Sequence, residues 1–466
     1  MPFLFIPLSL RETLKNKADL INAGGWLVGM FIVLQILRLG TNVGLAHLLA
    51  PELLGTMALI NTLRTGGELL TDVGIGQSIV NNKDGEKPYF YNTAWTIQII
   101  RGFFLFGVTF AAIFPLAKIY DEPELTILLP VSAFLFIITG FASPARFVFQ
   151  KRIAVKTLSI MRFYGALFSA VVHLALAWYM QSVWALIWAL LISCIFETLL
   201  TFWMLKLPFP KLMIDRQAAR EIFRYGKWIF LSTLVYFLAS NFDRLYLAEA
   251  VSFAALGVYG IARTFADTAM NLTAYLASNI LFPKVSTSAL RGTELRAAIL
   301  PSRRAVVWLI AGGMAVGVVF ADLFILLAYD VRYEAAAFYL PVLLAGGWFA
   351  MLASFSESIL MGIGKPSNVA FGNAAKFAAI LVIVPFVLPR YGMGAAVMAF
   401  SGVEIVRYFV LAFRQQAHGL SFWRQDIATT SAFIALAVLL REITGLLGVT
   451  SGVAGWTAMI RQVLSI

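Results

Sequence analysis

Three ionisable residues, Arg64, Glu68 and Asp72, follow one another at intervals of four in an apolar part of the chain. On a helix this spacing places the three side chains on one face. A guanidinium group on that face can fork onto phosphate oxygens. A buried carboxyl group there can hold and release a proton or a cation. These residue types therefore indicate a site for an anion beside a site for a coupling proton or cation.

Other ionisable residues lie in comparable apolar segments. The candidate cations for binding an anion are Arg38, Arg64, Arg263 and Lys376. The candidate carboxylates that line the cavity and serve in coupling are Glu68, Asp72, Asp243, Asp267 and Glu357. A structural alternative stays open, because partners four positions apart, such as Arg263 and Asp267, can simply neutralise each other. Asp322, Arg101 and Arg407 lie nearer the ends of apolar segments, where snorkelling side chains are expected.

The elements that position these groups are membrane-spanning helices. Of the 466 residues, 60% are hydrophobic and 13% are charged, whereas soluble domains carry about 25% charged residues. Apolar runs of about 20 residues recur, and in a bilayer such runs form helices because backbone polar groups must be satisfied internally. The sequence predicts an all-α polytopic membrane protein with about 12 to 14 transmembrane helices. The expected spans are 24–47, 53–80, 91–118, 125–147, 158–179, 183–205, 225–248, 255–282, 304–328, 337–361, 368–388, 391–414, 427–441 and 443–460.

One sequence landmark recurs about half a chain length later. Leu54-Gly55 opens the segment that carries Arg64 and Glu68, and Leu256-Gly257 opens another segment with an i,i+4 pair of opposite charges. The repeat predicts two pseudo-symmetric six-helix lobes, related by an axis along the membrane normal because each half has an even number of helices. A charge at the bilayer centre costs about 2.5–3.5 kcal/mol, so the charged faces should point into a hydrated central cavity.

Lysine and arginine separate the connections into two sides. The connections expected on one side hold most of these residues, and the alternate connections hold only Lys118, Arg332, Arg390 and Arg441. The positive-inside rule then places the N-terminus in the cytoplasm. The net charge of +12 reflects this topology and an attraction to membrane lipids, so we expect no nucleic-acid partner.

Enzymatic and metal chemistry find little support in the sequence. The three histidines, His47, His173 and His418, are scattered, and Cys194 is the single cysteine, so no metal site and no cofactor are expected. The longest connections, about 206–224 and 283–303, leave no room for a soluble catalytic domain. We therefore expect no catalytic residues and a protein that is not an enzyme.

Several short stretches, taken in order, carry a resemblance to a known family. In the first half they are Leu48-Leu-Ala-Pro-Glu-Leu-Leu-Gly55, Thr71-Asp-Val-Gly-Ile-Gly-Gln77, Ile119-Tyr-Asp-Glu-Pro-Glu-Leu125, Phe149-Gln-Lys-Arg152 and Val183-Trp-Ala-Leu186. In the second half they are Asn241-Phe-Asp-Arg-Leu245, Ala255-Leu-Gly-Val-Tyr259 and Phe282-Pro283. The chain resembles, over residues 20–425, the polysaccharide transporter (O-antigen flippase) family of the multidrug/oligosaccharidyl-lipid/polysaccharide (MOP) exporter superfamily.

This resemblance implies a fold and a function. It implies that the chain, like members of that family, has two six-helix lobes around a central cavity. It also implies that the chain carries undecaprenyl-diphosphate-linked oligosaccharides across the bacterial inner membrane by alternating access. The expected cargo is a repeat unit of lipopolysaccharide, capsule or exopolysaccharide, with proton or cation flux as the coupling and polysaccharide polymerase machinery as a partner. The expected division is a cytoplasmic segment 1–22, an N-lobe 23–205, a cytoplasmic linker 206–224, a C-lobe 225–414, and one or two more helices in 415–466.

Three other functions remain as alternatives. The first is a drug or cation antiporter of the same superfamily. The arginines argue against this function, because a cationic substrate would be repelled by their like charge. A membrane enzyme of polysaccharide assembly, either a polymerase or a glycosyltransferase, would be expected to have a long external loop, and the outward connections here are short. A membrane scaffold that transports nothing is the third.

Overall fold

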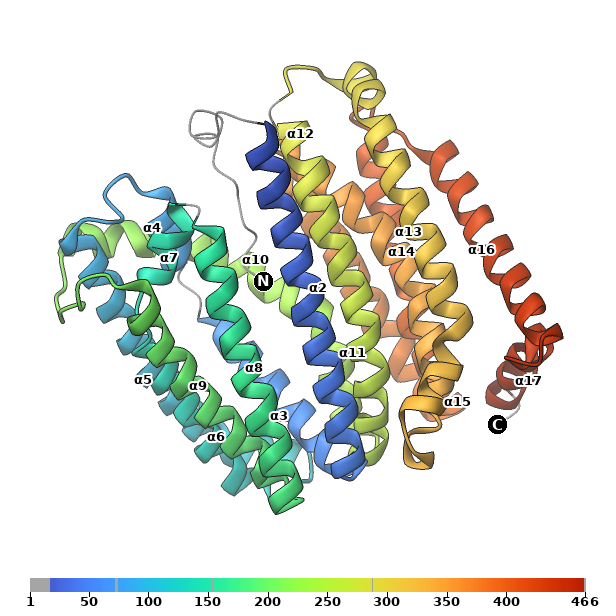
Figure 1. The fold of residues 1–466 in the computed structure, drawn as a ribbon, viewed down its shortest axis with the longest axis horizontal. Coiled ribbons are helices and arrows are strands. Elements are labelled where there is room, and N and C mark those ends of the chain that lie inside the picture. The colour runs from blue at the N-terminus through green and yellow to red at the C-terminus, as the bar shows by residue number, and fades with distance from the viewer. Residues whose placement is uncertain (1–16, 72–73, 153, 287, 465–466) are drawn as a thin grey trace. The chain divides into compact units, whose positions relative to one another are not determined.

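The computed structural model describes residues 17–71, 74–152, 154–286 and 288–464, and every regular element within these ranges is a helix (Figure 1). The predicted all-α class is therefore confirmed. The α-helices are α2 (Lys17–Leu48), α3 (Pro51–Leu70), α4 (Ile75–Asn81), α5 (Pro88–Ile119), α6 (Leu125–Gly140), α7 (Ala145–Lys151), α8 (Val155–Met180), α9 (Val183–Leu205), α10 (Arg216–Ala250), α11 (Phe253–Leu276), α12 (Phe282–Ser286), α13 (Gly292–Ala328), α14 (Ala336–Gly362), α15 (Pro366–Gln416), α16 (Trp423–Leu446) and α17 (Gly452–Leu464). A π-helical turn (Ala277–Leu281) joins α11 to α12, and a short 3₁₀ helix (Val331–Tyr333) precedes α14.

Length and composition identify the membrane-spanning helices. Among the described residues, eight helices are long and apolar enough to cross a bilayer, and the bent pair of α6 and α7 makes up to nine. The eight are α2, α5, α8, α9, α13, α14, α15 and α16. Helices α3, α10 and α11 are absent from this set, and they carry ionisable residues singled out in the sequence. The chain is thus a multi-pass membrane protein.

Backbone breaks fall at glycines and prolines in several predicted spans. The predicted uninterrupted helix over 53–80 is wrong, because α3 ends at Leu70 and α4 begins after Gly74, whose φ of 67° lies in the left-handed region. Glycine reaches that region without the steric cost that other residues carry. In α15 the chain kinks at Gly392 (φ 74°), three residues after Pro389. This kink separates the spans predicted at 368–388 and 391–414.

The structure divides into two compact units. Unit 1 comprises residues 1–237 and 244–256, and unit 2 comprises residues 238–243 and 257–466. The division falls inside α10 and α11, so the first part of α10 belongs to the unit that contains the preceding helices. The predicted domain boundaries and the pseudo-symmetry of the two lobes stay predictions.

Close backbone contacts between helices organise unit 1. Helix α5 packs along α6, α8 packs along α9, and α2 packs on α8 (Figure 1). At the crossing of α5 and α6, a Cβ atom on Gly102 would lie 2.5 Å from the carbonyl oxygen of Phe136. The side-chain amide of Gln98 donates to the carbonyls of Gly140 and Ala142 at 3.0 and 2.9 Å. This crossing therefore needs glycine and brings the two helices nearly into backbone contact.

Helix α14 is the most buried span of unit 2. It packs against α13 and α15, and α13 packs against α16. Trp348 of α14 is fully buried, stacks on Phe433 of α16 and donates from its indole nitrogen to Thr430 at 2.9 Å. Two buried ion pairs, Arg303–Asp426 and Arg441–Asp322, join α13 to α16 at 2.6 and 2.5 Å.

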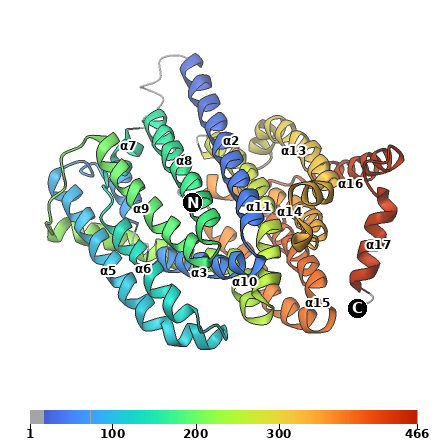
Figure 2. The same ribbon diagram turned by 60° about the horizontal axis from the view of Figure 1, so that its bottom comes forward.

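The C-terminal region contains one span and one short helix. Helix α16, with 24 residues, is longer than the predicted span 427–441 and is apolar enough to cross the membrane. Helix α17 has 13 residues and turns away from the end of α16 (Figure 2). A 13-residue helix is about 20 Å long, which is shorter than the hydrocarbon core of about 30 Å. The span predicted at 443–460 is therefore wrong, because residues 447–451 leave the helix and α17 is too short.

Candidate functional site

The charged stripe of the opening segment lies on α3 in unit 1. Arg64 and Glu68 lie on one helical face, with 3.6 Å between Nη1 and Oε1. Their side chains are 28% and 38% exposed, so this pair is partly exposed. Asp72, the third member of the predicted stripe, lies outside the described residues.

Arg101 of α5 reaches the end of the same helix. Its Nε donates to the hydroxyl of Thr71 at 2.9 Å, and its Nη2 donates to the main-chain oxygen of Glu68. The last carbonyl groups of a helix have no intrahelical donors, so a guanidinium group is a suitable partner for them. The snorkelling predicted for Arg101 is therefore wrong, because the side chain turns toward α3.

Three more charged residues from three further helices join this group. Arg146 of α7 interacts electrostatically with Glu68, Arg101, Glu197 of α9 and Arg162 of α8. Glu197 interacts with Arg146 and Arg64. Arg146, Arg162 and Glu197 are all exposed.

Helices α8 and α9 approach closely beside this acidic residue. A Cβ atom added to Gly165 of α8 would lie 3.1 Å from Cγ of Glu197. The glycine therefore makes room for the glutamate between two spanning helices. We call the whole group the arginine cluster, defined as Arg64, Arg101, Arg146, Arg162, Glu68 and Glu197.

The arginine cluster has an excess of positive charge. Four guanidinium groups face two carboxylates, which gives the six residues a net charge of +2. The helices that carry them belong to a membrane-spanning bundle, where charge exposed to lipid is strongly unfavourable. The face that exposes Arg146, Arg162 and Glu197 must therefore contact water or a polar ligand. Permanently charged, forked donors in such a place can bind an anion such as phosphate.

Two arginines of this cluster, Arg146 and Arg162, were not predicted as site residues from the sequence. Arg162 nevertheless lies within the predicted span 158–179. A charged residue inside a span is itself the signal that would have identified Arg162. Arg38, a predicted cation, is exposed on α2.

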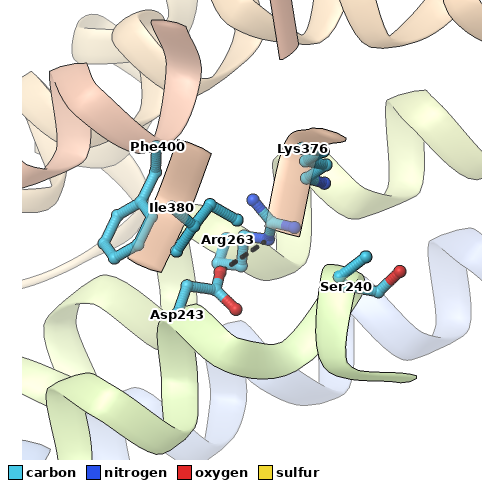
Figure 3. Close-up of a pocket in the computed structure, with 7 residues that line it drawn as sticks. Ser240, Asp243, Arg263, Lys376, Ile380 and Phe400 are labelled. Carbon is cyan, nitrogen blue, oxygen red and sulfur yellow. Dashed lines mark ion pairs between the residues drawn. The ribbon is translucent and has the colours of Figure 1, made fainter. Parts of the chain in front are cut away.

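A second group of charges is buried in unit 2. Arg263 of α11 lies between two carboxylates, with Nε 3.0 Å from Asp267 and 3.5 Å from Asp243 of α10. Figure 3 shows the pair with Asp243. The hydroxyl of Tyr259 donates to Oδ2 of Asp243 at 2.5 Å. Ser240, Asp243, Arg263 and Lys376 line one small pocket with apolar neighbours.

The remaining pairs of this group involve α14 and α15. Lys376 donates to Oε1 of Glu404 at 2.5 Å, and Arg407 donates to Glu357 at 2.6 Å and to the side chain of Asn373 at 3.0 Å. A second oxygen of Glu404 lies 3.8 Å from Arg407. The snorkelling predicted for Arg407 is therefore wrong, as it is for Asp322, which pairs with Arg441.

We call this group the unit 2 ion network, defined as Asp243, Arg263, Asp267, Glu357, Lys376, Glu404 and Arg407. It contains three cations and four carboxylates, so its formal net charge is −1. Arg263 and Lys376, which the sequence offered as phosphate ligands, each have a carboxylate partner here. The neutralising interpretation is thus favoured for these two cations, whereas the arginine cluster in unit 1 keeps a positive excess. Across the part of the chain that the structure describes, no group of three or more His, Cys, Asp or Glu residues is arranged to hold a metal ion.

Comparisons with known proteins agree with this architecture. A teichuronic acid biosynthesis protein, TuaB of Bacillus subtilis (strain 168), is 23% identical over 313 residues, which cover 65% of this chain and 63% of that relative. A structure of the lipid II flippase MurJ in an inward closed conformation superposes with a TM-score of 0.73 at 11% identity, covering 89% of this chain and 92% of that one.

A multidrug resistance MATE family transporter of the MOP superfamily, in an inward-facing conformation, superposes with a TM-score of 0.63 at 15% identity. That superposition covers 86% of this chain and 95% of the transporter. The fold is therefore the one shared by these MOP-type transporters, as the resemblance in the sequence implied. The family model described as "Polysaccharide biosynthesis protein" matches residues 44–337, and the chain belongs to that family.

Proposed function

We propose that this protein is a flippase that moves undecaprenyl-diphosphate-linked oligosaccharide across the bacterial inner membrane by alternating access. The observation that carries the proposal is the arginine cluster, a positively charged and partly exposed group on helices of a membrane-spanning bundle. Family membership in polysaccharide biosynthesis supports the choice of a sugar-containing substrate. The likeness to a lipid II flippase supports a fold suited to lipid-linked cargo.

The positive charge of the cluster complements the negative charge of the diphosphate group of the substrate. A lipid-linked diphosphate must take its negative charge past about 30 Å of hydrocarbon. Arginine keeps its charge at all relevant pH values and presents parallel donors to phosphate oxygens. Arg64, Arg101, Arg146 and Arg162 would share the diphosphate, and the sugar would follow through the same hydrated path. A cationic drug would meet repulsion from this cluster, which disfavours the antiporter alternative.

The unit 2 ion network is our candidate for coupling. Its carboxylates outnumber its cations by one, and Asp267 and Glu357 retain partial exposure with side chains 26% and 24% accessible. A carboxylate in excess inside a protein favours uptake of a proton or a cation. We propose that this exchange in unit 2 drives or times the movement of substrate bound in unit 1.

The proposal includes a membrane orientation and a set of partners. The N-terminus and the basic connections would lie in the cytoplasm. The protein would perform no catalytic step and use no metal or cofactor. Its partners would be the lipid-linked oligosaccharide, the surrounding lipids and the polymerase machinery that consumes the oligosaccharide on the far side.

Export of surface polysaccharide tests the proposal in cells that depend on this protein. Arg146→Ala should abolish export while the protein still inserts, and Arg146→Lys should restore only part, because an ammonium group keeps the charge but loses the fork. Arg390→Ala is the matched control, since this exposed arginine donates to the carbonyl of Phe386 one turn away and lies over the ring of the same residue. Normal export by Arg146→Ala would count against the proposal.

A further inference from the structure

The connection between α9 and α10, residues 206–215, is held along the surface of unit 1. The backbone N–H groups of Lys211, Met213 and Asp215 each donate to a side chain of α5. The acceptors are Asn92 Oδ1, Thr96 Oγ1 and Thr93 Oγ1, at 3.0, 3.0 and 2.9 Å. In the first turns of α10, which follows directly, Ala218 and Ile222 are fully buried in an apolar cluster of unit 1. This segment, which we call the linker strap, is therefore part of the folded unit.

The linker strap lies at the level where a membrane-spanning helix leaves the hydrocarbon. Helix α9 has 23 residues and ends at Leu205, directly before the strap. Helix α5 has 32 residues and is about 48 Å long, which exceeds the hydrocarbon core of about 30 Å. Its first turns, to which the strap is bonded, therefore extend into the headgroup region.

The strap exposes apolar side chains that a purely aqueous surface would not favour. Phe209, Leu212 and Ile214 are 70%, 71% and 58% exposed. The ring of Phe209 also lies 5.9 Å from that of Trp95 in an edge contact, and tryptophan is typical of the membrane interface. Exposed apolar groups concentrated at one place indicate an interaction surface.

Basic side chains surround these apolar groups. They are Lys206, Lys211, Arg216 and Arg220, and all four are exposed. Apolar side chains that insert among lipid chains, flanked by lysine and arginine, are typical of segments that bind anionic membrane surfaces.

We propose that the linker strap is a membrane anchor that binds anionic phospholipid on the face of the membrane where the basic connections gather. Phe209, Leu212 and Ile214 insert at the boundary of headgroups and acyl chains, and the four basic residues bind the phosphate groups of anionic lipids. The hydrogen bonds to α5 transmit this attachment to unit 1. The proposal goes beyond transport and does not depend on the substrate.

Fluorescence quenching by lipid tests the anchor on the full-length protein in vesicles. In a Cys194→Ser background, a bimane label is placed at Leu212→Cys, and a control label at Lys83→Cys, an exposed position in the polar loop before α5. The vesicles contain phosphatidylcholine with brominated acyl chains, with or without one third phosphatidylglycerol. The label at position 212 should be quenched at least about twofold more than the label at position 83, as expected for a side chain buried about 5–10 Å into the interface.

Charge dependence supplies the second half of the test. Phosphatidylglycerol should increase quenching at position 212, and the variant Lys206→Gln/Lys211→Gln/Arg216→Gln/Arg220→Gln should remove that increase. The matched control Lys284→Gln/Arg291→Gln, in another basic connection, should leave it unchanged. Equal quenching at positions 212 and 83 would contradict the proposal that the strap is inserted in the membrane. Quenching at position 212 that does not change with phosphatidylglycerol would contradict the binding of anionic lipid. Because no arm measures export, a failure here is distinguishable from a failure of the proposed function.

Discussion

Lys376 offers a direct choice between binding substrate and neutralising a buried partner. Its Nζ lies 2.5 Å from Glu404, and the two side chains are only 10% and 8% exposed. Lys376→Met would leave this carboxylate with Arg407, 3.8 Å away, as its remaining ion-pair partner. Breaking a buried pair by removing one member costs about 3–5 kcal/mol.

This loss of stability can be measured as a decrease in the thermal unfolding temperature. A change of 1 kcal/mol moves the unfolding temperature by about 2–4 °C in a unit of 150–250 residues. Lys376→Met should therefore lower the transition of purified protein in detergent by roughly 6–20 °C. Lys365→Met, at an exposed lysine just before the same helix, should shift it by less than about 2 °C, because surface substitutions usually change stability by about 0.5 kcal/mol or less.

The double variant Lys376→Met/Glu404→Gln completes the test. With no unpaired charge left, it should recover most of the lost stability and keep substantial polysaccharide export, since our account assigns the substrate to unit 1. Arg407 would keep its bond to Glu357. A stable double variant that exports nothing would refute the reasoning, because it would show that Lys376 and Glu404 take part in transport and do more than neutralise each other.

Three further outcomes follow from the structure. Gly102→Ala should destabilise the protein by at least about 1–3 kcal/mol in thermal unfolding, because its Cβ would collide with the backbone of α6. Gly107→Ala on the same helix is the control. Its Cβ meets nothing within 4 Å, so it should be neutral or stabilising. Arg441→Met should lower the unfolding temperature strongly, since this guanidinium is fully buried and bonded to a carboxylate; an unchanged transition would contradict the role of the pair. A cysteine at Lys151 should resist an impermeant thiol reagent in intact cells while one at Glu122 is labelled, and the reverse pattern would invert the proposed topology.

The sequence alone was sufficient for the class of fold. Long apolar runs leave helices as the only way to satisfy the backbone in a bilayer, and the four-residue spacing of Arg64 and Glu68 predicted their common face. The kink in α15 at Gly392 also lies close to the predicted boundary between the spans 368–388 and 391–414. Local signals of this kind depend on residues close in the chain.

The composition of the arginine cluster needed tertiary structure. Arg101, Arg146, Arg162 and Glu197 come from four different helices, so no spacing along the chain relates them. For the same reason, spacing alone could not distinguish Arg64, which remains partly exposed, from Arg263, which lies between two carboxylates contributed by α10 and α11. The end of α3 at Leu70 and the left-handed conformation of Gly74 were not predicted, because a glycine inside an apolar run can continue a helix or end it.

The central claim is that the arginine cluster holds the diphosphate of the substrate, and equilibrium binding tests it most directly. Undecaprenyl diphosphate would be titrated into purified wild-type protein and into Arg64→Gln/Glu68→Gln, a variant that removes a pair of opposite charges and leaves no unpaired partner from it. If Arg64 contacts the phosphate, the variant loses a charge-assisted hydrogen bond worth about 1.5–3 kcal/mol, so its affinity should fall by about 10-fold to 150-fold. An affinity equal to that of the wild type would contradict the account and leave Arg64 and Glu68 as a structural pair.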